Sequence, residues 1–136
     1  MLAEAADLLA RPEFRGATLA IPDALLALPV SFYSPPELRS RIVFPADSKL
    51  ALQYLGNDSV HISLERLHAY IPLRTESLVP FFGRTAENIL VLNAAYFPGN
   101  GSSFFGEYLR SQPELAARAK VIREYPFGSV VLLPAR

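Results

Sequence analysis

Asn88–Ala94 (NILVLNA) is the stretch that decides the fold of this 136-residue chain. Its apolar run is continuous and has the length of a strand, which is typical of a central β-strand covered on both faces. Two shorter apolar segments, 17–21 and 41–44, predict further strands earlier in the chain. Helical patterns separate the three strands, and this alternation predicts a parallel sheet with helices on both faces.

Helix signals fill the intervals around these strands. We predict helices over 2–10, 24–33, 48–54, 59–71, 75–82, 104–110 and 113–119, and a single helical turn over 37–40. The predicted N-caps are Asp23, Asp47 or Ser48, and Asp58 or Ser59. Gly56 stands at a helix end that favours a left-handed backbone, and Pro29 is expected to kink or shorten its helix.

The last part of the chain predicts a β-hairpin. Residues 121–125 and 129–133 have strand character and flank Pro126-Phe127-Gly128, which supplies a turn. The hairpin adds an antiparallel edge to the parallel sheet. We therefore expect one α/β domain over residues 1–136. It is a small three-layer, Rossmann-like domain in which residues 1–15 form an amino-terminal helix and lead-in.

The composition is that of a globular protein without a net charge. Hydrophobic residues make up 51% of the chain, and 13 Lys and Arg residues balance 13 Asp and Glu residues. Because there is also no run of like charges, nucleic acid is not an expected partner. The chain has no cysteine, which excludes disulfides, thiolate nucleophiles and cysteine-ligated metal centres.

The sequence predicts no transmembrane segment. No stretch reaches the roughly 18 consecutive apolar residues of a membrane span, and the most apolar one, 19–32, is interrupted by Pro22, Asp23 and Pro29. The first ten residues lack the basic residues and the cleavage site of a signal peptide. Export of this domain would therefore depend on a segment outside the 136 residues.

Four polar side chains line one stripe of the helix predicted over 59–71: Asp58, His61, Glu65 and His68. Imidazoles and carboxylates bind zinc and other divalent ions, so His61, Glu65 and His68 are candidate metal ligands. The alternative is a solvated polar face, in which Asp58 caps the helix and Glu65 pairs with a neighbouring cation. We favour the solvated face and expect no cofactor.

A loop with two glycines follows the central strand and precedes a predicted helix: Gly99, Asn100, Gly101, Ser102 and Ser103. Backbone N–H groups in such a loop, aided by the helix dipole, can hold a phosphate. A dinucleotide fingerprint, however, needs a third glycine where Phe104 stands, and no Gly-Lys-Ser/Thr of a P-loop follows. A turn with a serine N-cap explains the loop equally well.

The sequence also bears on catalysis and on aromatic binding surfaces. No Gly-x-Ser-x-Gly elbow is present, and the carboxylates have capping or loop explanations, so we expect no catalytic residue. The aromatics form adjacent pairs: Phe32-Tyr33, Phe81-Phe82, Tyr96-Phe97 and Phe104-Phe105. In such pairs we expect one ring to pack inward and the other to stay partly exposed. Core packing is the expected default for most of these rings, and rings that stay exposed could form a sugar-binding or partner surface.

Three segments carry a more specific resemblance: Phe32–Leu38 (FYSPPEL), Arg41–Asp47 (RIVFPAD) and Leu52–Val60 (LQYLGNDSV). In pattern and order they resemble the carboxy-terminal extracytoplasmic domain of bacterial membrane glycosyltransferases related to protein mannosyltransferases and aminoarabinose transferases. Those domains often read as a YYAPPEL turn, a strand ending in ADP, a helix ending in RYTGTD and a late hairpin. The arrangement here is similar from about Ala17 to the end.

The resemblance implies a noncatalytic accessory domain. In that family a polytopic membrane domain transfers a sugar from a polyprenyl-phosphate carrier to an acceptor, and the catalytic acid lies in a loop near its first membrane helices. No catalytic residue therefore carries over to this chain. The implied location is periplasmic, with tethering through a missing amino-terminal part, or cytoplasmic if Met1 is the true start. The implied partners are a glycan or protein acceptor and the membrane domain of the same polypeptide.

Two other hypotheses remain open on the sequence. One is a freestanding small α/β enzyme or nucleotide-binding protein that holds a phosphate in the loop over 99–103. The other is a protein-interaction module that docks through its aromatic pairs, which would require an exposed apolar patch of more than a few hundred Å².

Overall fold

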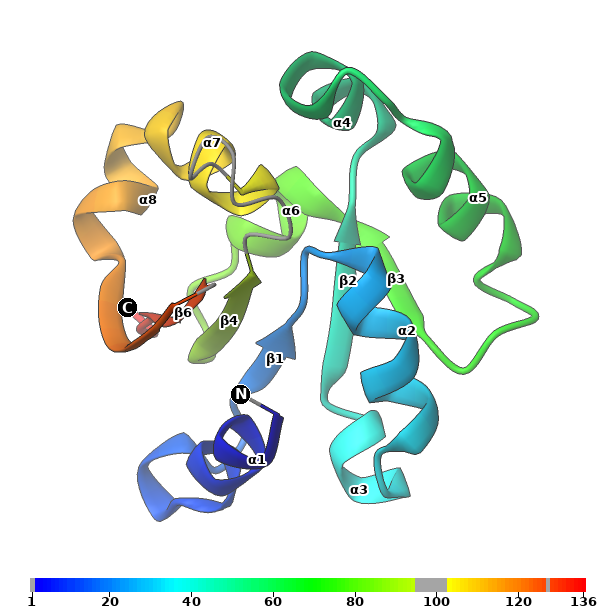
Figure 1. Ribbon diagram of the computed structural model, residues 1–136. Coiled ribbons are helices and arrows are strands. Elements are labelled where there is room, and N and C mark those ends of the chain that lie inside the picture. The colour runs from blue at the N-terminus through cyan, green and yellow to red at the C-terminus, as the bar shows by residue number, and fades with distance from the viewer. Residues whose placement is uncertain (1, 95–102, 127) are drawn as a thin grey trace.

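The computed structural model describes residues 2–94, 103–126 and 128–136, which form one six-stranded sheet of order β3-β2-β1-β4-β6-β5 (Figure 1). The strands are β1 (Thr18–Ala20), β2 (Ile42–Ala46), β3 (Arg74–Ser77), β4 (Ile89–Ala94), β5 (Lys120–Tyr125) and β6 (Gly128–Leu133). Strands β1 to β4 run parallel, while β6 lies antiparallel to both β4 and β5. This confirms the α/β fold with a mostly parallel sheet and a terminal antiparallel hairpin.

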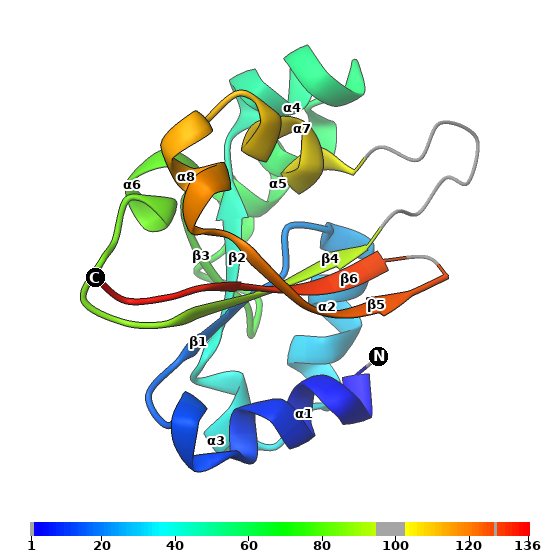
Figure 2. The same cartoon turned by 90° about the vertical axis from the view of Figure 1, so that its left-hand side faces the viewer.

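Helices cover both faces of this sheet. They are α1 (Leu2–Ala10), α2 (Ala24–Tyr33), α3 (Pro36–Arg39), α4 (Ser48–Leu55), α5 (Ser59–Leu67), α6 (Leu78–Phe82), α7 (Phe104–Arg110) and α8 (Pro113–Arg118), with a 3₁₀ turn, η1 (Pro12–Phe14). One core cluster joins α1, α2 and α5 to one face of the sheet, and a second joins α4, α6, α7 and α8 to the other. Figure 2 shows α1 on one side of β4 and β6 and α7 and α8 on the other.

Strand β4 contributes to both clusters, as its continuous apolar run predicts. Leu90 and Leu92 belong to the cluster under α2, whereas Ile89 and Val91 belong to the cluster under α6 and α7. All four side chains are at most 1% exposed. Alternation of side chains across a strand therefore places every residue of ILVL in one of the two cores.

Two of the three N-caps predicted from the sequence, and the helix end at Gly56, are confirmed in the structure. Asp23 accepts a hydrogen bond from the Leu26 N–H (3.1 Å) and Asp47 accepts one from the Leu50 N–H (3.0 Å), so each caps its helix. Gly56 ends α4 with a φ of 69°. Asp58 precedes α5 without a capping bond, and Asn57 instead accepts a hydrogen bond from the Ser59 N–H (2.9 Å).

Pro29 does not shorten α2, which continues to Tyr33. The end of the helix is satisfied by Arg39, whose guanidinium donates to the backbone oxygens of Ser31, Phe32 and Ser34. The predicted bounds of this helix are therefore confirmed, its shortening by Pro29 is wrong, and the kink stays a prediction.

The helix predicted over 75–82 is wrong in its first half. Residues Arg74–Ser77 form the edge strand β3, which pairs with β2 from Val43 to Ala46, and only Leu78–Phe82 is helical. The side chain of Glu76 pairs with Arg74 (2.7 Å) and with Arg84, so the polar edge strand is held by ion pairs as well as by the sheet. The preceding helix, α5, ends at Leu67 rather than at residue 71.

Arg41 ties the first helices to the sheet. Its guanidinium donates to the backbone oxygens of Leu9 (3.0 Å), Phe14 (2.7 Å) and Ala17 (2.9 Å). These three acceptors belong to α1, to η1 and to the residue before β1. One side chain therefore satisfies three backbone carbonyls that lie outside the regular ladders.

Candidate functional site

A cleft of about 590 Å³ opens at the carboxyl ends of β1 and β4. From β1 the chain passes to β2 and β3 on one side and then returns to β4 on the other, so the cleft lies where the strand order reverses. In open α/β sheets this reversal point is the usual place for a ligand. The cleft is lined by the β1–α2 turn, the α4–α5 connection, the end of β4 and the start of α7.

Asp23 occupies the β1–α2 turn, where dinucleotide-binding folds carry glycines that approach a pyrophosphate. Its carboxylate lines the cleft and caps the amino terminus of α2. Burial raises the pKa of Asp23, and hydrogen bonds from the N–H groups of Leu26 and Leu25 act in the opposite direction. A carboxylate therefore takes the position at which an anionic ligand would meet the helix dipole.

His61 is buried beside the cleft. Its side chain is 4% exposed and packs against the rings of Phe44 (centroids 5.2 Å apart) and Phe104 (4.8 Å). Its Nδ1 accepts a hydrogen bond from the Asp47 N–H (3.1 Å). Burial lowers the pKa of His61 despite the negative charges of Asp47 and Asp58. The ring is therefore neutral near pH 7 with its hydrogen on Nε2, and the predicted solvated face is wrong at this residue.

The structure does not bring the three candidate metal ligands together. Glu65 accepts a hydrogen bond from the Ser48 N–H (3.3 Å), and Nδ1 of the exposed His68 lies 2.8 Å from the Glu65 backbone oxygen. Across residues 2–94, 103–126 and 128–136, no group of three or more His, Cys, Asp or Glu side chains is arranged to hold a metal ion.

The glycine loop is placed only at its last residue. Gly99, Asn100, Gly101 and Ser102 lie outside the described residues. Ser103 lines the cleft and caps α7, because its Oγ accepts a hydrogen bond from the Gly106 N–H (2.9 Å). The expected serine N-cap is thus confirmed, and the phosphate hypothesis stays a prediction.

Among residues 2–94, 103–126 and 128–136, five polar side chains that line the cleft have hydrogen-bonding atoms beyond those used in bonds to one another and to their neighbours: Asp23, Asn57, His61, Asn93 and Ser103. Asn57 uses Oδ1 as an acceptor toward Ser59, which leaves its amide N–H groups as donors. Asn93 uses its amide nitrogen toward Ser129 (3.5 Å), which leaves Oδ1 as an acceptor. The His61 Nε2–H and the Ser103 hydroxyl add donors, and the Asp23 carboxylate adds an acceptor.

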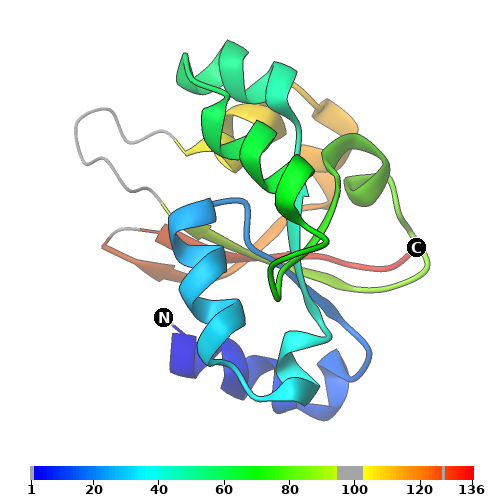
Figure 3. The same ribbon diagram turned by 90° about the vertical axis from the view of Figure 1, so that its right-hand side faces the viewer.

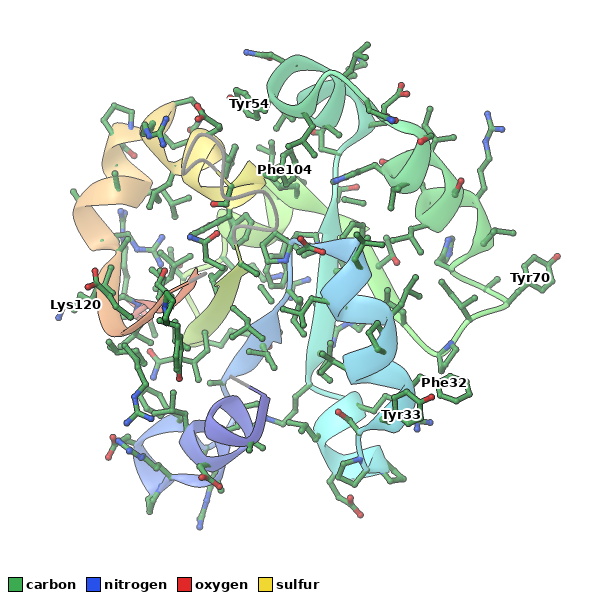
Figure 4. All side chains as sticks on the ribbon, viewed as in Figure 1. Phe32, Tyr33, Tyr54, Tyr70, Phe104 and Lys120 are labelled. Carbon is green, nitrogen blue, oxygen red and sulfur yellow. The ribbon has the colours of Figure 1, made fainter. Side chains whose placement is uncertain are left out.

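Aromatic rings form the apolar part of the same cleft. Tyr54 from α4 and Phe104 from α7 face one another with centroids 6.2 Å apart (Figure 4). Phe104 and Phe105 are both buried, as are Phe81 and Phe82, whereas Phe32 and Tyr33 are both exposed. The expectation of one ring in and one ring out is therefore wrong for all three described pairs, whereas the expected default of core packing holds for four of the six described rings. Tyr96 and Phe97 lie outside the described residues.

The lowered pKa of His61 predicts a loss of stability in mild acid. Between the folded pKa and the ordinary value of about 6.5, the unfolded chain binds more protons than the folded chain. The unfolding free energy is therefore expected to fall as pH decreases below about 6.5, with a slope of at most about 1.4 kcal/mol per pH unit. Urea unfolding between pH 7.5 and 5.5 measures this slope.

The variant His61→Asn isolates this contribution, because an amide oxygen can still accept from the Asp47 N–H while no titrating group remains. We expect the slope to disappear in His61→Asn. His68→Asn is the matched control for replacing an imidazole by an amide at an exposed position, and the contribution of His61 to the slope is expected to persist in it. An unchanged slope in His61→Asn would contradict the assignment.

In the part of the chain that the structure describes, no helix has the length and apolar character to cross a bilayer. The cleft at the strand-order reversal is the candidate functional site, and the sequence alone had singled out only two of its polar residues, His61 and Ser103, as possible ligand-binding groups. Comparison with known protein families, with characterised proteins and with solved structures finds no match for this chain.

Proposed function

We propose that this chain is a noncatalytic accessory domain that binds a neutral, hydroxyl-rich ligand, such as a saccharide, in the cleft. Its setting is a bacterial membrane glycosyltransferase that uses a polyprenyl-phosphate sugar, with this domain on the periplasmic side. There it would bind the glycan, or a glycan on a protein, that accepts the sugar. Docking on the membrane domain of the same polypeptide accompanies this role.

The mixture of donors and acceptors that the described residues present in the cleft carries the proposal. A sugar hydroxyl both donates and accepts, so it suits a site with the donors of Asn57, His61 and Ser103 and the acceptors of Asp23 and Asn93. The described residues that line the cleft include neither Lys nor Arg, and they do include the carboxylate of Asp23. A phosphate group would therefore meet like charge without a compensating cation.

The aromatic lining supports the same class of ligand. Tyr54 and Phe104 offer apolar surface beside the polar groups, and a pyranose has apolar C–H faces between its hydroxyls. Pockets for small molecules generally combine apolar lining with a few orienting polar groups. Tyr54, Leu55, Asn57 and Val60, which line the cleft, all come from the segment 52–60 that carries the resemblance.

Calorimetric titration with methyl glycosides, free disaccharides, nucleotides and sugar phosphates tests the proposal. We expect saturable binding of neutral saccharides and weaker binding of their phosphorylated forms. Asn57→Asp keeps the oxygen that bonds Ser59 but replaces the amide donor, and it is expected to lower saccharide affinity roughly tenfold, which corresponds to one hydrogen bond of about 1.4 kcal/mol.

Asn88→Asp is the matched control. Asn88 also accepts a backbone hydrogen bond, from the Ala135 N–H (2.8 Å), but it precedes β4 and lies at the other end of that strand from the cleft. This variant is expected to bind saccharides like the wild type. Binding of nucleotides or sugar phosphates without binding of neutral saccharides would instead support a phosphate-binding protein.

The tethered setting has its own test. An antibody to the domain is expected to detect a longer polypeptide in the bacterial membrane fraction, and detection of a free 15.0 kDa protein would contradict the tethered setting.

A further inference from the structure

Helix α2 is apolar on its outer face as well as on its inner face. Its sequence, ALLALPVSFY, contains no charged residue. Ala24, Ala27 and Val30 are buried against the sheet, as expected for a helix in an α/β layer. The opposite side carries a stripe of Leu25, Leu28 and Phe32, which are 58%, 38% and 63% exposed. Surface helices normally place polar side chains there.

This α2 stripe begins inside the cleft. Leu25 is a lining residue of the cleft and also the first member of the stripe, and Leu28 and Phe32 follow at i+3 and i+7 on the same side of the helix. From Leu25 to Phe32 the helix rises about 10 Å. Figure 3 shows α2 running from the cleft end of the sheet toward α3, and Figure 4 shows Phe32 at the far end of α2 from Tyr54 and Phe104.

The size of the α2 stripe favours a small occupant. Stable protein interfaces bury about 800 Å² on each partner, whereas three partly exposed side chains on one helix offer only a few hundred Å². A single hydrocarbon chain laid along the helix needs no more than such a stripe. Its polar end would then meet the donors and acceptors of the cleft, because Leu25 belongs to both surfaces.

We infer that the ligand of this domain is amphipathic, with a saccharide head in the cleft and a linear hydrocarbon chain along the α2 stripe. This inference rests on the proposed function and names the class of ligand within it. The cleft supplies orientation through hydrogen bonds, and the stripe supplies affinity in proportion to the apolar area that the chain and the helix remove from water.

Titration with methyl, hexyl and octyl β-D-glucoside, each below its critical micelle concentration, tests the inference. If another methyl glycoside binds more tightly than methyl glucoside, the methyl, hexyl and octyl glycosides of that sugar are used in place of the glucosides. Full burial of a methylene group raises affinity about fourfold. A chain that lies on the helix is covered on one side only, so each methylene is expected to raise affinity about twofold. Octyl glycoside is therefore expected to bind wild type at least tenfold more tightly than the methyl glycoside.

The double variant Leu28→Ser/Phe32→Ser is expected to abolish this dependence on chain length and to leave the affinity for the methyl glycoside unchanged. The matched control is Leu52→Ser/Val79→Ser, which removes two exposed apolar side chains of α4 and α6 that do not line the cleft. In this control the dependence on chain length is expected to persist.

The outcomes separate the inference from the proposed function. Binding of the methyl glycoside with no gain from the chain overturns the inference and leaves the proposed function standing, as does a gain that survives in Leu28→Ser/Phe32→Ser. Failure of every glycoside to bind overturns both. Two further results would also overturn the inference. If the wild type sediments as a dimer and Leu28→Ser/Phe32→Ser does not, the stripe binds a second copy of the chain. If the wild type floats with phosphatidylcholine vesicles and Leu28→Ser/Phe32→Ser does not, the stripe binds a bilayer.

Discussion

Phe82→Ala is expected to lower the unfolding free energy by about 3–5 kcal/mol, the usual cost of removing a buried phenyl ring. The Phe82 side chain is 1% exposed and packs against the rings of Phe81, Phe105 and Tyr108, with centroids 5.1–5.8 Å apart. These rings come from α6 and α7, so the cavity would open between two helices of one layer. Chemical unfolding followed by circular dichroism measures the change.

Phe32→Ala is the matched control, because the same substitution at a 63% exposed side chain is expected to change stability by no more than about 0.5 kcal/mol. Domains of this size have unfolding free energies of only about 5–15 kcal/mol. Phe82→Ala is therefore expected to leave a marginally stable domain, while Phe32→Ala leaves a normal one. Equal effects of the two variants would show that the α6–α7 layer is not a rigid core.

Arg41→Ala is expected to cost about 3 kcal/mol and to loosen the amino-terminal helices in particular. The substitution removes charge-assisted hydrogen bonds to the carbonyls of Leu9, Phe14 and Ala17. A net hydrogen bond from a charged group contributes about 1.5–3 kcal/mol, and contributions of neighbouring bonds add incompletely. Hydrogen exchange is expected to accelerate most in residues 2–17, since they depend on this side chain for attachment.

Arg41→Lys separates the charge from the geometry. An ammonium group at the end of a flexible chain cannot reach three divergent acceptors as a planar guanidinium does, so Arg41→Lys is expected to recover less than half of the lost stability. Arg15→Ala, at an exposed arginine of the same region, is the control for loss of charge alone. If Arg41→Ala were no more destabilising than Arg15→Ala, the tie between α1 and the sheet would lie elsewhere.

Features of the fold that depend on neighbours in sequence were predictable. Asp23 and Gly56 act at the helix ends where their residue types are favoured, and the ILVL run of β4 is buried on both faces. Strand β3 was not predictable, because Arg74–Ser77 has no apolar run and gains its strand conformation from pairing with β2.

The second strand shows a similar limit. It continues through Pro45, which lacks an N–H and usually marks the end of a strand. The backbone oxygen of Val43 points toward β1, where it accepts a hydrogen bond from the Ile21 N–H. Backbone groups of residues two apart along a strand point to the same side, so those of Pro45 also point toward β1. The pairing between β1 and β2 ends at Ala20 and Val43, before it reaches Pro45. The N–H that Pro45 lacks would therefore have had no partner in β1, and the sheet loses no hydrogen bond.

The site was less predictable than the fold. Once the strand order is known, the rule for strand-order reversal points to Asp23, in the turn after β1, and to Asn93, the penultimate residue of β4. The sequence groups His61 with Asp58, Glu65 and His68 on one polar stripe of a helix, which favours a solvated face. The structure buries His61 and Leu64 and leaves Val60 and Leu67 about half exposed, since the imidazole finds distant partners in Phe44, Phe104 and the Asp47 N–H.

The pairing of β1 with β4 also has a kinetic consequence. The two strands meet at Thr18 and Ile89, and helices α2 to α6 lie in the long loop that this pairing closes. Helices form within about a microsecond, whereas distant strands pair only after the entropic cost of closing the loop is met. Until then both apolar faces of β1 and β4 are open to other chains. The interval between helix formation and strand pairing is therefore when a newly made chain is most prone to aggregate.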